Sequence, residues 1–212
     1  MGPMTSPKKH RTALTRRSPR QERAHETVAV ILDAAWLLLR QQGLSGFNTN
    51  RIAERAGVSI GTLYGYFPNK QSILVALARR LLEVDRQAVA EALQAAAAQN
   101  TDPVRGIVRA LFQRHRLDAG LRRTLLGAYL GAGLAADDAG QVRAQVAAIA
   151  AHPGGPLAGR PLTDVQVFVL SRAVLGVARA LTEDAEALPG AGQALEDETV
   201  RLVRAYLAVA AG

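Results

Sequence analysis

The segment AGVSIGTLYGYFPNK, at residues 56–70, combines hydroxyl side chains, two tyrosines and two glycines in a stretch whose neighbours follow helical patterns. A tyrosine hydroxyl can donate to a phosphate oxygen, and its ring can lie against base edges or a thymine methyl group. Gly61 has no Cβ, which would let the start of a helix approach a duplex closely. These properties suit contact with nucleic acid. The alternative is that Tyr64 and Tyr66 only pack one face of an amphipathic helix.

The sequence contains no group of residues with the types and spacing of a catalytic or metal-binding site. There is no cysteine, which excludes disulfides, thiolate metal sites and cysteine nucleophiles. The run GAYLGAGLAADDAG lacks the Lys-Ser/Thr pair and the preceding strand of a phosphate loop, so Gly127 and Gly131 are interpreted as sites of close helix contact. We therefore expect no enzyme, no metal site and no cofactor. The histidines, which lack the spacing of metal ligands, are His10, His25, His115 and His152.

The positive charge is concentrated in the first third of the chain. The net charge is +8, and residues 1–80 hold 13 Lys and Arg against 4 Asp and Glu. A basic N-terminal unit favours a polyanionic partner, for which nucleic acid and an acidic membrane surface are the two alternatives. Residues 1–20 contain too few apolar side chains to order themselves by burial, so they are expected to form a flexible basic arm.

Local signals place three helices before Asn69. Apolar residues recur at helical spacing from residue 21 to Gly43, and a glycine there is suited to end a helix. A second helix follows a cap at Asn48 or Thr49 and ends at Gly57, and a third begins after Ser59 and is halted by Pro68. Two short helices on a tight, glycine-containing turn are a helix-turn-helix. The side chains expected to face inward are Ile52, Ala53, Ala56, Val58, Leu63 and Phe67.

The rest of the chain is expected to be helical as well. Asn69 is suited to cap a long helix that continues to Ala98 with no internal Gly or Pro. The tripeptide at residues 101–103, TDP, is suited to cap the next helix. Hydrophobic residues make up 49% of the chain and aromatic residues only 4%, which favours closely packed helices with an aliphatic core. The fold class is therefore all-α, with later helices expected at about residues 103–117, 119–135, 138–151, 162–187 and 191–211.

Neither export nor membrane insertion is indicated. The most apolar run, VAVILDAAWLLL, is too short to span a bilayer and carries Asp33. The basic N-terminus is not followed by the apolar region of a signal peptide. A cytoplasmic location without a membrane partner is expected.

The stretch TNRIAERAGVSIGTLYGYFPNKQSIL resembles the DNA-binding domain of the TetR family of bacterial transcriptional regulators. The resemblance covers about residues 25–75 and rests on many positions at fixed spacing, while residues 76–212 match only in length and helix count. It implies a three-helix helix-turn-helix domain at residues 21–68 and a larger ligand-binding and dimerisation domain at residues 69–212. The basic arm at residues 1–20 resembles extensions that some family members lay into the minor groove, with a solvated tail as the alternative.

The resemblance also implies roles for individual residues. Phosphate contacts fall to Thr49, Tyr66 and Lys70, and base reading to Asn50, Ile60, Gly61, Thr62 and Tyr64. Ser59 serves either as a cap or as a phosphate donor. Gly65 departs from the family, which usually has a larger side chain there, and costs the helix about 1 kcal/mol relative to alanine.

Residues of the larger domain were assigned to two further sites. The alternative to a ligand pocket is burial in a core for the aromatic candidates and a partly exposed place on a helix for the histidine; the candidates are Phe112, His115, Tyr129 and Phe168. By resemblance the last two helices form a four-helix dimer interface, through Val165, Phe168, Leu175, Leu181, Leu195, Leu202, Val203 and Tyr206. The expected function is that of a homodimeric, ligand-responsive regulator, most often a repressor, bound to a palindromic operator. The alternative is a DNA-binding protein without an inducer.

Overall fold

A computed structural model describes residues 19–116, 119–133, 144, 146–149, 162–183 and 190–210. These residues form helices and connections without a strand, which confirms the all-α prediction. Residues 1–18 of the predicted basic arm and most of the helix expected at residues 138–151 lie outside them, whereas Pro19 and Arg20, also assigned to the arm, begin the first helix. The helices are α1 (Pro19–Gly46), α2 (Thr49–Ala56), α3 (Ile60–Tyr66), α4 (Lys70–Gln99), α5 (Val104–Arg116), α6 (Ala119–Gly131), α8 (Asp164–Glu183) and α9 (Gly192–Ala210).

Side-chain caps begin the short helices where the sequence predicts them. The Asn48 side chain accepts a hydrogen bond from the Asn50 amide at 2.8 Å, so Asn48 is the cap of α2. Gly57 ends that helix in the left-handed conformation, with φ 66°. Asn69 forms a reciprocal capping box with Ser72 at the start of α4.

Several helix boundaries lie a few residues from their predicted positions, and the end of α1 and the start of α5 are two examples. Regular helix geometry stops at Gly43, where φ is 63° and ψ is −165°, but a further helical turn carries α1 on to Gly46. Asp102 accepts from the Val104 amide at 2.9 Å, which confirms the predicted cap, although α5 begins at Val104 and not at Pro103.

The helix-turn-helix rests on a core of aliphatic and aromatic side chains. Ile52, Ala53, Leu63 and Phe67 are buried as predicted, while Ala56 and Val58 are half-buried at the edge of this core. Residues of α1 and of the first half of α4 complete it, together with Leu125 and Tyr129 of α6. The core of the helix-turn-helix end therefore includes side chains from well beyond residue 68.

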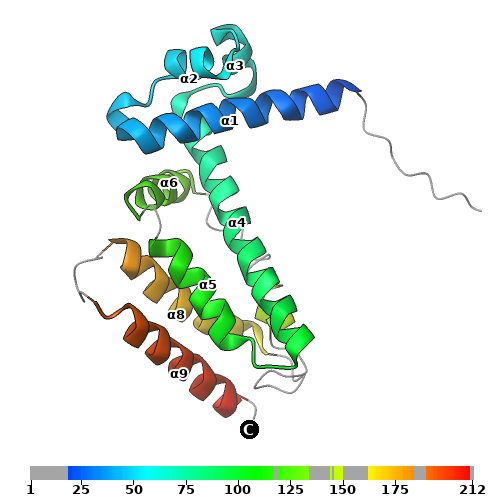
Figure 1. Ribbon diagram of the computed structural model, residues 1–212, viewed down its shortest axis with the longest axis vertical. Coiled ribbons are helices and arrows are strands. Elements are labelled where there is room, and N and C mark those ends of the chain that lie inside the picture. The colour runs from blue at the N-terminus through cyan, green and yellow to red at the C-terminus, as the bar shows by residue number, and fades with distance from the viewer. Residues whose placement is uncertain are drawn as a thin grey trace, which may run out of the picture.

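A second core lies at the other end of the molecule. It joins the second half of α4 to α5, α8 and α9 (Figure 1). Because α4 contributes Ile73, Leu74 and Leu77 to the first core and Val89 to the second, one continuous helix connects the two ends.

A buried ion pair fastens α6 to the middle of α4. Arg122 donates to both carboxylate oxygens of Asp85, at 2.6 and 3.0 Å, and the two residues are only 3% and 7% exposed. Arg114 of α5 donates to the same carboxylate at 3.2 Å. Three helices thus meet at one buried negative charge, between the two cores.

The interpretation of Gly127 and Gly131 as sites of close helix contact is wrong within this chain. A Cβ built at either position meets no atom within 4 Å, because both glycines lie on the exposed side of α6. Among the described residues, no helix is long and apolar enough to cross a membrane.

Candidate DNA-binding surface and interior cavity

Hydrogen bonds fix the two short helices to each other and fix the start of α3. The Ser59 hydroxyl accepts from the Thr62 amide at 3.0 Å and lies 2.8 Å from the Thr62 hydroxyl. Ser59 is therefore a helix cap, one of the two roles that its position suggested. Across the turn, the hydroxyls of Thr49 and Tyr64 are 3.2 Å apart. This contact ties the start of α2 to the middle of α3 and sets the direction of the Tyr64 ring.

The outward face of α3 is open to solvent. Ile60, Tyr64 and Tyr66 are 39%, 47% and 40% exposed, although large apolar and aromatic side chains gain free energy from burial. The opposite face, with Leu63, is fully buried. The two tyrosines therefore do not serve as core packing. Of the nine residues implied as DNA contacts, Thr49 is half-buried and the other eight are exposed: Asn50, Ser59, Ile60, Gly61, Thr62, Tyr64, Tyr66 and Lys70.

Lys70 is held at the junction of α1 and α4. Its Nζ donates to the carbonyl of Leu44 at 3.2 Å and lies 5.6 Å from the centre of the Phe47 ring. The cation–π contact and the hydrogen bond restrict a side chain that would otherwise be mobile. The charge is consequently held against the end of α1, four residues after the end of α3.

Two glycines lie one helical turn apart on α3. A Cβ at Gly61 would approach only the Ser59 hydroxyl, at 3.8 Å, and a Cβ at Gly65 would meet nothing within 4 Å. Neither glycine is required by φ or by packing within the chain. Since residues i and i+4 share a helix face, the glycines leave a strip of α3 without side chains.

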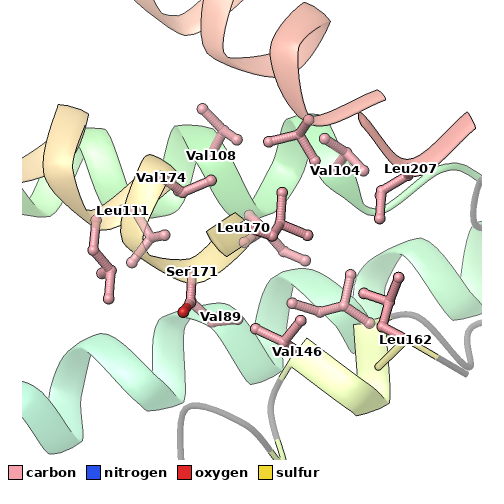
Figure 2. A pocket seen from close by; sticks show the side chains of 14 residues that line it. Val89, Val104, Val108, Leu111, Val146, Leu162, Leu170, Ser171, Val174 and Leu207 are labelled. Carbon is pink, nitrogen blue, oxygen red and sulfur yellow. The ribbon is translucent and has the colours of Figure 1, made fainter. Parts of the chain in front are cut away.

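The second core contains a cavity of about 120 Å³, partly open to solvent, between α4, α5, α8, α9 and the helical segment at residues 146–149 (Figure 2). Its lining is aliphatic except for the hydroxyl of Ser171, and the described lining residues include no charged and no aromatic side chain. The lining residues are Val89, Val104, Ile107, Val108, Leu111, Val146, Ile149, Leu162, Leu170, Ser171, Val174, Leu175, Val203 and Leu207.

The four residues proposed for a pocket from the sequence lie elsewhere. Phe112 is buried in the second core but does not line the cavity, and Tyr129 is buried in the first core. Phe168 is 61% exposed on α8, with the Arg172 guanidinium over its ring. The four candidates are aromatic or titratable, whereas the described cavity lining is aliphatic apart from Ser171. Aliphatic residues around a cavity have the same sequence pattern as those of a filled core.

His115 lies buried beside the ion pair of α4 and α6. Its Nδ1 is 2.9 Å from the carbonyl oxygen of Leu111, one turn earlier. Burial, reinforced by the positive charge of Arg122, lowers the pKa of His115, while the Leu111 carbonyl and the charge of Asp85 oppose that change. The expectation that His115 is partly exposed is wrong, because the residue is only 5% exposed.

The residues proposed for a dimer interface divide into two groups. Val165, Phe168 and Leu202 are exposed, as are Val169 on α8 and Val209 on α9. The others face the second core: Val203 is buried and lines the cavity, Leu175 lines it as well, and Leu181, Leu195 and Tyr206 pack against the core.

Within the described part of the chain, no group of three His, Cys, Asp or Glu side chains could hold a metal ion. What the structure presents is a short, capped helix with an exposed face, supported by a second helix across a tight turn. That arrangement, at the end of the molecule with the basic excess, defines a helix-turn-helix DNA-binding protein.

Comparison with known proteins identifies the family. Residues 31–77 match the family described as bacterial regulatory proteins, tetR family. The chain is 32% identical over 98 residues to the transcriptional regulator BetI of Paraburkholderia xenovorans (strain LB400), a match covering 46% of this chain and 50% of that protein. It is 46% identical over 56 residues to the transcriptional repressor KstR of Rhodococcus jostii (strain RHA1), covering 26% of each.

A solved structure extends the likeness to the whole fold. The TetR-family transcriptional regulator from Streptomyces coelicolor aligns with a TM-score of 0.59 and 22% identity, over 87% of this chain and 99% of that chain. The N-terminal helix-turn-helix domain of this chain is therefore a TetR-family DNA-binding domain. The chain spans about half, or less, of the length of the named relatives that it matches in sequence.

Proposed function

We propose that the protein is a homodimeric transcriptional repressor that acts in the cytoplasm. In this proposal α3 enters the major groove of a palindromic operator, and a small molecule bound in the aliphatic cavity releases the DNA. The observation that carries the proposal is the exposed, side-chain-poor face of α3, on a helix whose start and direction are fixed by Ser59 and by the contact between Thr49 and Tyr64.

The division between phosphate and base contacts follows from position. Thr49, Tyr66 and Lys70 lie around the margins of α3, where hydroxyl and ammonium groups suit phosphate oxygens. Asn50, Ile60, Gly61, Thr62 and Tyr64 are assigned to the base edges. The hydroxyl of Tyr64 already contacts Thr49, which leaves the ring and its edge for a base or a thymine methyl group.

The uncovered apolar surface of α8 and α9 supports a dimer. Val165, Phe168 and Val169 recur at helical spacing on α8, and Leu202 and Val209 on α9. Covering such a surface with a second copy would place two recognition helices on one DNA molecule, and a two-fold dimer suits a palindromic site. Phe168→Glu combined with Leu202→Glu is expected to shift sedimentation from dimer to monomer, and a dimer unchanged by both charges would refute this interface.

The route from cavity to DNA runs through α4. Val89 lines the cavity, while Ile73, Leu74 and Leu77 of the same helix pack under the helix-turn-helix. The 30 residues of α4 contain no Gly or Pro that would absorb a movement as a kink. A ligand that tilts α4 would change the separation of the two recognition helices, so ligand and operator must weaken each other reciprocally, by about 5- to 150-fold.

The test begins with an operator selected by the protein from a library of random duplexes. Footprinting should show two related half-sites about one helical turn, or slightly more, apart. Protection of a single asymmetric half-site at saturation would contradict dimeric docking.

Two substitutions then separate reading from positioning. Tyr64→Ala should lose preference at particular bases. Lys70→Gln keeps a side chain over Phe47 but removes the charge. It should therefore lower the affinity for all DNA sequences about equally and reduce the slope of log affinity against log salt by about one. If both variants kept the wild-type ratio of specific to nonspecific affinity, the assigned roles would be wrong.

A further inference from the structure

The lining of the cavity restricts the chemistry of its ligand, and this inference rests on the regulatory role proposed above. A ligand in this cavity would touch α4 through Val89, α5 through Val108 and Leu111, and α8 through Leu170 and Val174 (Figure 2). All of these are aliphatic. Burying an unpaired charge among these side chains would cost more free energy than the apolar contacts provide, so a charged ligand is disfavoured.

The charged side chains buried on the surrounding helices are already paired. Asp85 of α4 is bound by Arg122 and Arg114, and Glu196 of α9 is bound by Arg105 and Arg109. Neither carboxylate lines the cavity. A cationic ligand would therefore find no free carboxylate among the described residues around it, and the described lining offers no aromatic ring for a cation–π contact.

Among the described lining residues, Ser171 provides the one polar side chain, and its hydrogen bond determines whether its hydroxyl can donate to or accept from a ligand. Its hydroxyl donates to the carbonyl of Phe168 at 3.0 Å, within the same helix. With the proton committed, the oxygen has lone pairs left to accept a hydrogen bond. A ligand that matches this site carries one neutral donor, such as an alcohol, at the edge of an apolar body.

The cavity volume limits the size of the apolar part of a ligand that the cavity can bury. A cavity of about 150 Å³ in another protein holds benzene, and the cavity here measures about 120 Å³. Six or seven non-hydrogen atoms would fill it without movement of the helices. We infer that the cavity binds a small, uncharged aliphatic molecule with a hydroxyl group that donates to Ser171.

The inference is tested by calorimetry on the full chain without DNA, using four probes of nearly equal size. 1-Hexanol carries the donor, dipropyl ether has the same atoms without a donor, and hexylammonium and hexanoate carry charges. 1-Hexanol should bind, with affinity rising about fourfold for each methylene from 1-butanol to 1-hexanol. Hexylammonium and hexanoate should bind at least about 100-fold more weakly. Equal affinity for either ion would overturn the inference.

Variants locate the binding. Ser171→Ala should lower the affinity for 1-hexanol by about two- to tenfold and leave the affinity for dipropyl ether unchanged. Val174→Phe should fill the cavity and abolish binding, whereas the same change at exposed Val30 on α1 should not. An equal loss of both probes in Ser171→Ala, or undiminished binding in Val174→Phe, would contradict the assignment. Melting temperatures of the variants identify any that fail to fold, and a filled cavity in a folded Val174→Phe protein is the decisive case.

A second measurement separates this inference from the proposed function. The same probes are added to the protein bound to its selected operator. If 1-hexanol binds the cavity but leaves DNA affinity unchanged, the ligand chemistry stands and the ligand-responsive role fails. If a charged compound releases the DNA while the alcohols do not bind, the regulatory role stands and the inferred ligand chemistry is wrong.

Discussion

The helix-turn-helix end and the cavity end of the molecule are built from similar aliphatic residues, but they use burial differently. Under α2 and α3, Ile52 and Leu63 are completely buried and leave the functional side chains outside. Around the cavity, the side chains of Leu111 and Leu170 border empty space as well as other core side chains. One end therefore needs a rigid core that presents a surface to a large, flat partner. The other needs a core that is incompletely filled, so that a small molecule can be enclosed.

The ion pair between the two cores should show one of the two largest effects of a single substitution. Arg122→Met leaves the Asp85 carboxylate buried with only Arg114 beside it, which should cost about 3 kcal/mol in the free energy of unfolding. Arg80→Met is the matched control on α4, because its ion pair with Asp33 is exposed and should be worth less than about 1 kcal/mol. Urea denaturation at one protein concentration measures both. Equal losses would mean that the junction between the cores is not fastened by this pair.

The same truncation on either side of the comparison should cost different amounts. Leu63→Ala removes a side chain packed on all sides and should destabilise by about 2–5 kcal/mol. Leu111→Ala removes one that already faces the cavity and makes fewer contacts, so its loss should be at least about 1 kcal/mol smaller. Thermal and urea unfolding provide the comparison. A loss in Leu111→Ala as large as that in Leu63→Ala would indicate a cavity end as tightly packed as the DNA-binding end.

A glycine substitution sharpens the contrast at the surface. Gly65→Ala on α3 and Gly127→Ala on α6 each add a methyl group in open space on an exposed helix, and each should stabilise by about 1 kcal/mol. If the bare strip of α3 serves close approach to DNA, only Gly65→Ala should weaken operator binding, by several-fold. Anisotropy titrations with the selected operator decide this. Unchanged affinity in Gly65→Ala would remove the functional explanation for that glycine.

The smallest expected effect is a dependence of stability on pH through His115. Because its pKa is lowered in the folded protein, the unfolded chain binds the proton first as the pH falls below about 6.5, the ordinary value for histidine. The free energy of unfolding should therefore decrease from pH 7 toward pH 5. His115→Gln should show a shallower decrease over that interval. Parallel curves for the two proteins would mean that His115 does not contribute.

The accuracy of the sequence predictions follows the range of the interactions involved. Asn48, Gly57, Ser59 and Asn69 act on atoms within a few residues of themselves. The predictions of Gly57 as a helix stop and Asn69 as a cap are confirmed, and the structure selects the cap role for Asn48 and Ser59, each of which was predicted with an alternative. The inward face of the helix-turn-helix follows from helical spacing alone and was also predicted. Gly43 shows the limit of such signals, since it breaks the helix geometry but the chain resumes a helical turn afterwards.

The sequence by itself determined the helical class, the capped helix-turn-helix and the family, because these depend on neighbours along the chain and on a motif of fixed spacing. Only the tertiary structure decided which aliphatic residues surround a cavity. Val89, Leu170 and Leu207 come together from three helices far apart in sequence, and nothing in their local pattern distinguishes them from filled core. The pairing of Asp85 with Arg122, across 37 residues, was decided in the same way. A charge on an amphipathic helix is ordinarily solvated, and burial comes only when other helices pack over it.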